Sequence, residues 1–300
     1  MNRTPTFEAF IAPAREDFAL WRTVVTFLLG FALYIFWTAI LILGVGIFFA
    51  GDYGIEASLT ALMAGLESGG TPFYMAILLA TFIPMMGAAM LMVILYDRSP
   101  LTLFGRRKNF VRNFAIGAGI IVAFNLIYFV YDWLWGVSDL TRNLATAEWL
   151  GYLVWALPLL LIQITAEELV FRGFLVQQLA VRFKNPIWWM VLPSVIFGLA
   201  HLDPSVDPFL AAMVVLATTV FGIVAVDLTR VTGNLGAAMG LHFANNFFAM
   251  MVAATPNRMS GLGLFHTSYS MQDSEVMIPL LGFGTVLLGV IWLIARWALR

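Results

Sequence analysis

Long runs of apolar residues set the strongest limit on how this chain can fold. A helix needs roughly 20 apolar residues to cross a bilayer, and about eight runs in the sequence have this character. They cover about 23–49, 73–96, 114–135, 150–180, 187–202, 209–228, 234–253 and 277–296. The chain is 61% hydrophobic and 11% charged, and a soluble protein of this length has too little interior to bury so much apolar surface. We therefore expect an all-α, polytopic transmembrane helical bundle.

Basic residues predict the orientation of the bundle. Lys and Arg gather before the first apolar run and in every second connection, of which 97–113 is the most basic. Such residues are retained on the cytoplasmic side, so we expect about eight spans with both termini cytoplasmic. No repeat or second domain is apparent, and residues 1–300 are expected to form a single membrane-embedded domain. The net charge of −1 gives no basic field that would attract nucleic acid.

One apolar run carries a cluster of charged residues, which are costly inside a membrane and need a reason to be there. Glu168 and Arg172 are four residues apart, so they share a helix face and can pair. Glu167 lies about 100° further round the helix. We expect one carboxylate to be held by the arginine and the other to be left free.

Two of the three histidines lie in later apolar runs. His201 ends the fifth run, and His242 lies inside the seventh, four residues before Asn246. The third, His266, falls in a predicted outer connection and is expected to have no part in a site. A helical bundle can bring carboxylates, imidazoles and a carboxamide together away from lipid. A buried glutamate can act as a general base toward water, an imidazole can orient the water or protonate a leaving amine, and an amide can donate to an oxyanion.

Three motifs occur in order in successive apolar runs. They are Glu167-Glu168-x-x-x-Arg172, Phe197-x-x-x-His201 and His242-x-x-x-Asn246. Together they resemble the signature of the CAAX-protease and bacteriocin-processing (CPBP) family of intramembrane endopeptidases. The resemblance covers roughly 160–250, and we take about 150–253 as the catalytic core.

The resemblance implies roles for these residues. The catalytic set would be Glu167, His201 and His242 around an activated water, with Asn246 as the oxyanion donor. Glu168 and Arg172 would support this set. The implied activity is hydrolysis of a peptide bond, with a protein or peptide as substrate and membrane lipids as surroundings. The implied location is a bacterial inner (plasma) membrane. Nothing in the sequence specifies an oligomeric state.

Alternatives to this reading stay open. A scaffold or immunity protein could keep the motifs and act by binding a partner. A transporter could relay protons through the same side chains, although no inverted repeat or pair of broken helices supports it. Glu167, His201 and His242 are also ligand types for a catalytic zinc ion. We favour a mechanism without a metal cofactor, with zinc as the alternative.

The position of His201 is inconsistent with a site shared with Glu167 if all eight runs cross the membrane completely. It ends a run that should leave the membrane on the outer side, whereas Glu167 lies close to the cytoplasmic edge. One water cannot touch both across a bilayer. We therefore predict that the short fifth run crosses only part of the membrane, and that 202–208 is a buried connection near its middle.

Overall fold

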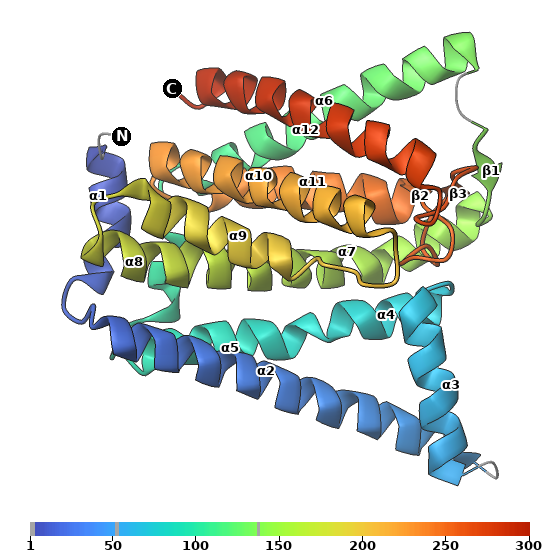
Figure 1. The fold of residues 1–300 in the computed structure, drawn as a ribbon, viewed down its shortest axis with the longest axis horizontal. Coiled ribbons are helices and arrows are strands. Elements are labelled where there is room, and N and C mark those ends of the chain that lie inside the picture. The colour runs from blue at the N-terminus through green and yellow to red at the C-terminus, as the bar shows by residue number, and fades with distance from the viewer. Residues whose placement is uncertain (1–3, 52–53, 137–138) are drawn as a thin grey trace.

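The computed structural model describes residues 4–51, 54–136 and 139–300, and it is built almost entirely from helices (Figure 1). The helices in chain order are α1 (Pro5–Ile11), η1 (Ala12–Ala14), α2 (Leu20–Phe48), α3 (Gly54–Ser68), α4 (Pro72–Ala80), α5 (Phe82–Ile94), η3 (Pro100–Phe104), α6 (Phe110–Trp135), α7 (Thr146–Glu168), η4 (Leu169–Leu175), α8 (Val176–Arg182), η5 (Ile187–Val191), α9 (Leu192–Leu199), α10 (Pro208–Thr232), α11 (Gly236–Phe247), η6 (Phe248–Val252) and α12 (Ser274–Ala298). Three two-residue strands, β1 (Thr141–Arg142), β2 (Ala253–Ala254) and β3 (Phe265–His266), pair in the order β1-β3-β2.

All eight apolar runs are helical, which confirms the predicted polytopic helical bundle. Within the described residues, six helical segments are long and apolar enough to span a membrane. They are α2, α4–α5, α6, α7–α8, α10 and α12. The other two runs form shorter helices, η5–α9 and α11–η6. The number of complete crossings and the side on which the termini lie therefore stay predictions.

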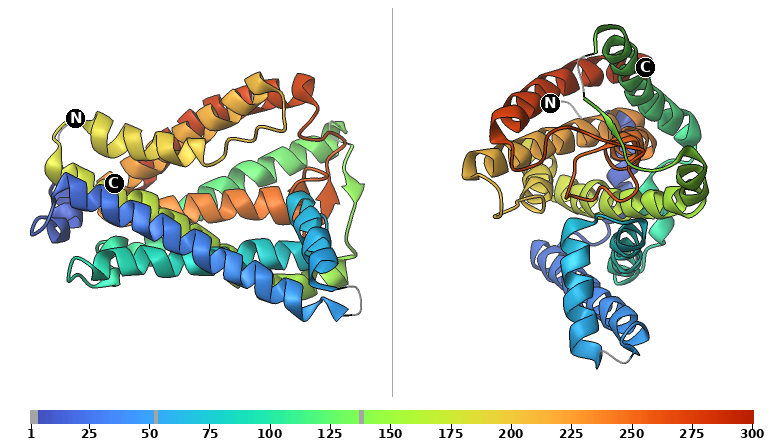
Figure 2. Two further views of the ribbon diagram at one scale, coloured as in Figure 1. Left: turned by 60° about the horizontal axis from the view of Figure 1, so that its bottom comes forward. Right: turned by 90° about the vertical axis from the view of Figure 1, so that its right-hand side faces the viewer.

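A helix that the sequence analysis treats as part of a connection joins α2 to α4. This helix, α3, turns only one edge inward, since Leu62 and Leu66, four residues apart, are its buried side chains. Figure 2 shows α2 and α3 extending away from the group formed by the other helices. Their outer surfaces are strongly apolar, as expected for helices surrounded by lipid.

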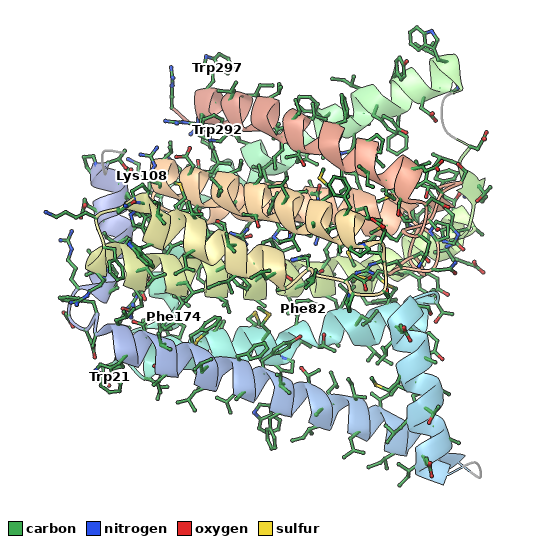
Figure 3. All side chains as sticks on the ribbon, viewed as in Figure 1. Trp21, Phe82, Lys108, Phe174, Trp292 and Trp297 are labelled. Carbon is green, nitrogen blue, oxygen red and sulfur yellow. The ribbon has the colours of Figure 1, made fainter. Side chains whose placement is uncertain are left out.

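The first described helix, α1, and the C-terminal end of α12 lie at one end of the bundle (Figure 1). Lys108, from the most basic connection, lies at this same end (Figure 3). So do Trp21 and Trp297, which are 69% and 73% exposed and suit a membrane–water interface. Partial burial lowers the pKa of Arg98 to about 10, so its guanidinium stays charged at neutral pH and adds to this basic end.

Glycines let the histidine-bearing segments pack closely on their neighbours. A Cβ built on Gly240 of α11 would lie 2.1 Å from the Phe114 carbonyl oxygen of α6. A Cβ on Gly198 of α9 would lie 2.2 Å from Oγ1 of Thr219 in α10. Small residues at such contacts allow helix backbones to approach each other within a membrane. The two contacts fix α11 against α6 and α9 against α10, and so position the histidine that each segment carries.

The chain leaves α9 part-way along the length of α10, then continues as an extended connection to the end where α10 begins (Figure 1). The partial crossing predicted for the fifth run agrees with this arrangement. The prediction that 202–208 is buried is wrong, because Leu202 is 53% exposed and only Val206 of this segment is buried. Its polar groups are satisfied locally instead: Asp203 pairs with Arg258, and Asp207 caps the start of α10.

Candidate active site

The predicted pair of Glu168 and Arg172 forms in the middle of the bundle. Arg172 Nη1 lies 3.1 Å from Glu168 Oε1, and both side chains are almost completely buried, at 1% and 0% exposure. The guanidinium also lies over the Phe197 ring, 4.2 Å from its centroid. Arg172 has no access to solvent, so its charge is balanced within the bundle by Glu168. The helix becomes a π-helix at η4, directly after Glu168, and such turns are frequent at functional sites.

His242 of α11 contacts both glutamates. Its Nδ1 lies 2.9 Å from Glu168 Oε1, and its Nε2 lies 3.4 Å from Glu167 Oε2. Since Arg172 holds Glu168 as a carboxylate, that carboxylate accepts the Nδ1 hydrogen of the imidazole. This assigns the Nδ1–H tautomer and directs Nε2 at Glu167. The sequence analysis expects Glu167 to be left free. In the structure, His242 instead contacts this carboxylate.

His201 follows α9, four residues after Phe197, and contacts the Phe197 ring. Its Nδ1 donates to the Phe197 carbonyl oxygen at 2.8 Å, which leaves Nε2 as the nitrogen able to accept a hydrogen bond. The Phe197 ring contacts both histidines, and its centroid lies 4.6 Å from that of His201 and 6.0 Å from that of His242. His201 is close enough to Glu167 for their charges to interact. It does not lie at an outer surface remote from the carboxylates.

Asn246 lies one helical turn beyond His242 on α11 and is partly exposed. Its Oδ1 accepts a hydrogen bond from Asn245 Nδ2 at 3.2 Å, so the Asn246 amide is oriented with its Nδ2 group available for another acceptor. Asn245 is exposed and orients its neighbour through this hydrogen bond.

Two polar residues near the site carry no motif, so sequence reasoning did not select them. Gln163 is buried on α7, one turn before Glu167, and its Oε1 has no hydrogen-bond partner among the described residues. The spacing of four residues from Glu167 is the signal that could have identified it. Tyr34 of α2 hydrogen bonds Thr81 and lies within electrostatic reach of Glu167, but no local sequence pattern connects it to the site.

The site thus combines a fixed ion pair with a glutamate–histidine contact in an apolar core. Several buried atoms here lack hydrogen-bond partners within the described structure: Glu167 Oε2, Glu168 Oε2, Arg172 Nη1 and Arg172 Nη2. Buried polar atoms of this kind normally have partners. The arrangement can accept a proton at the Glu167–His242 contact and can bind polar groups of another molecule beside it.

The zinc alternative requires Glu167, His201 and His242 to share one ion. Among the described residues, no three His, Asp or Glu side chains come close enough to hold a metal. Glu167 and His242 offer two neighbouring donors, but His201 does not complete the set. The side chains as arranged here therefore do not fit a three-ligand zinc site.

Comparison with known proteins supports the motif assignment. Residues 149–248 match the family described as type II CAAX prenyl endopeptidase Rce1-like. This match confirms the family resemblance indicated by the three motifs. The matched residues include every residue of the candidate site except Tyr34.

Part of the chain is similar to the protein YyaK of Bacillus subtilis, with 32% identity over 143 residues. The match covers 47% of this chain and 46% of YyaK, so the chain spans less than half of that relative's length. No solved structure matches this chain. The Rce1-like match and the apolar helices together describe an integral membrane protein with a protease-family core.

Proposed function

We propose that this chain is an intramembrane endopeptidase of the CAAX-protease type, in which Glu167 activates water for attack on a peptide bond. The observation that carries the proposal is the buried contact of His242 with both Glu167 and Glu168. A purely structural ion pair needs only Glu168 and Arg172. A second carboxylate held against an imidazole in an apolar core is instead typical of acid–base chemistry.

The proposed reaction proceeds by direct attack of water. Glu167 takes a proton as the water oxygen bonds to the scissile carbonyl carbon, and the amide of Asn246 donates to the oxyanion that develops. His201 accepts a hydrogen bond from the water through Nε2. His242 Nε2 shares the proton held by Glu167, and the proton passes to the leaving amine as the C–N bond breaks. Every proton is thus returned, and no covalent enzyme intermediate is needed.

Glu168 and Arg172 hold this machinery in place. The guanidinium keeps Glu168 charged, and Glu168 keeps His242 in the tautomer whose Nε2 faces Glu167. We propose that the reaction needs no resident metal ion, because the side chains as arranged supply a base, a proton carrier and an oxyanion donor.

The similarity to type II CAAX prenyl endopeptidases suggests a substrate whose C-terminus carries the CAAX sequence. A bacterial plasma membrane, with both chain ends on its cytoplasmic side, is the location we propose, supported by the basic end of the bundle and by the Bacillus relative. Residues of about 150–253 would form the catalytic core. The alternative is a membrane scaffold or immunity protein with the same fold, favoured if the motifs act only to bind a partner.

Two experiments test the proposal. In vesicles containing the purified protein, we would follow cleavage of a fluorogenic CAAX peptide, prepared with and without a farnesyl group on its cysteine. Cleavage of the farnesylated peptide alone indicates a prenylated substrate, and cleavage of both indicates recognition of peptide only.

The second experiment needs no guess of substrate. Membrane proteomes of cells producing the wild type or Glu167→Gln at equal levels would be compared. The proposal expects at least one protein to accumulate uncleaved in the Glu167→Gln cells. Identical proteomes, together with no cleavage of either peptide, would instead indicate the scaffold.

A further inference from the structure

Gln163 is a buried polar residue with no part in the proposed mechanism. It lies four residues before Glu167 in α7, so the two side chains occupy the same helix face. The side chain is 6% exposed, and its Oε1 is buried without a hydrogen-bond partner among the described residues. The oxygen and nitrogen of a buried amide normally both have hydrogen-bond partners. An unpartnered amide oxygen beside a candidate active site therefore suggests that another molecule supplies the hydrogen bond.

The packing of α7 against α11 indicates where that partner would lie. The two helices run in opposite directions (Figure 1) and meet where Glu167 contacts His242. The adjoining turns carry Gln163 on α7 and Asn246 on α11. Side chains lean toward the N-terminus of their own helix, so Asn246 leans back toward the reacting centre. Gln163 leans away from Glu167, toward the segment that lies next to the scissile bond.

The spacing fits an extended peptide. Four residues advance a helix by roughly 6 Å along its axis, and two residues advance an extended strand by roughly 6.6 Å. A substrate strand lying along α7 would therefore bring a second peptide group, two residues from the scissile bond and on the same side of the strand, to the level of Gln163. A glutamine side chain has both a donor and an acceptor, which matches the N–H and C=O of a peptide backbone.

We infer that Gln163 is a substrate-binding residue that hydrogen bonds a backbone peptide group about two residues from the scissile bond. This inference rests on the proposed endopeptidase activity, and it identifies a backbone peptide group as the part of the substrate that Gln163 binds. Recognition here is of the backbone, so it requires an extended strand and tolerates different side chains.

The test uses the fluorogenic CAAX peptide that the wild type cleaves and a series of ester analogues. In each analogue one backbone N–H near the scissile bond is replaced by oxygen, which removes a single hydrogen-bond donor. Cleavage is measured for the wild type, for Gln163→Leu, and for Gln178→Leu as a matched control. Gln178 is also a buried glutamine with unpartnered side-chain atoms, but it lies in α8, away from Glu167.

We expect Gln163→Leu to lower kcat/KM for the parent peptide by about tenfold, as for loss of one hydrogen bond in a buried site. One ester analogue, with the change about two residues from the scissile bond, should lower kcat/KM of the wild type by a similar factor and leave Gln163→Leu unaffected. Gln178→Leu should respond to that ester as the wild type does.

Other outcomes separate the two ideas. If Gln163→Leu cleaves the parent peptide as well as the wild type, or if every ester lowers both enzymes equally, the inference is wrong while Glu167-dependent cleavage still supports the endopeptidase. If the wild type cleaves neither CAAX peptide, the proposed activity on this substrate class fails, and the inference fails with it.

Discussion

His242 donates from Nδ1 to Oε1 of Glu168 across a distance of 2.9 Å. This contact makes Glu168 more than the counter-ion of Arg172, because it determines which nitrogen of the imidazole faces the second carboxylate. The buried site is therefore a chain of contacts in which the arginine holds one glutamate, that glutamate orients a histidine, and the histidine meets Glu167.

Replacing Glu168 by glutamine should damage both activity and folding. The neutral amide no longer fixes the Nδ1–H tautomer of His242, and loss of such an orienting carboxylate can cost on the order of 10²-fold or more in kcat. It also leaves Arg172 buried without a counter-ion. We expect lower yield and at least that loss of peptide cleavage, with Glu148→Gln as control because Glu148 is exposed on the same helix. Wild-type activity of the Glu168→Gln protein would contradict the proposal that Glu168 orients His242.

Arg172→Ala should lower the amount of folded protein in the membrane. Removing one partner of a buried ion pair typically costs on the order of 3–5 kcal/mol, and the Phe197 ring also loses its cation contact. Arg172→Lys should restore yield only in part, since a lysine cannot match the planar, stacked guanidinium. Arg182→Ala serves as control because Arg182 is exposed. Equal yields of wild type and Arg172→Ala, measured by size-exclusion chromatography in detergent, would refute a structural role for the pair.

Gly240→Ala should loosen the packing of α11 and α6. The added Cβ would meet the Phe114 carbonyl oxygen at 2.1 Å, whereas a Cβ at Gly119 of α6 has nothing within 4 Å. Overpacking of this kind costs about 1–3 kcal/mol. The thermal unfolding midpoint should therefore fall for Gly240→Ala and stay near the wild-type value for Gly119→Ala. Since His242 follows two residues later, cleavage should fall as well. Equal midpoints for both variants would contradict the close helix contact.

The sequence predicts local relationships in this protein better than distant ones. The apolar runs mark the helices, and the four-residue spacing of Glu168 and Arg172 predicts their ion pair, because helix geometry alone brings them together. The contact of His242 with Glu168 joins residues 74 positions apart and depends on how whole helices pack. The four-residue spacing of Gln163 from Glu167 indicates a shared helix face, but only the structure shows that its buried Oε1 has no hydrogen-bond partner among the described residues.

Depth in the membrane was the hardest feature to predict. Counting along apolar runs places His201 at an outer surface, but α9 ends part-way along α10, and His201 stays within electrostatic reach of Glu167. The connection 202–208 is exposed rather than buried because Asp203 and Asp207 satisfy its polar groups at the surface. Hydropathy shows which segments are apolar, but it does not predict the depth in the membrane at which a short helix ends.

Cleavage should survive removal of metal ions. The described side chains do not bring three ligands together, and the proposed reaction uses Glu167 itself as the base. Incubation of the vesicle-reconstituted protein with 1,10-phenanthroline, followed by removal of the chelator, should leave the rate of peptide cleavage within about twofold of the untreated rate, far from the loss expected if a catalytic metal were removed. Loss of activity that zinc restores would overturn the metal-free mechanism and favour recruitment of His201 as a third ligand.

The most direct test of the account is the rate at which vesicle-reconstituted Glu167→Gln cleaves the CAAX peptide that the wild type cleaves. The glutamine keeps the size of the side chain but cannot take a proton from water. Because positioned general bases contribute about 10²–10⁴-fold, kcat should fall by at least about 10²-fold, while yield and thermal unfolding stay near those of the wild type. A Glu167→Gln protein that cleaves the peptide at the wild-type rate would contradict the central claim that Glu167 activates the attacking water.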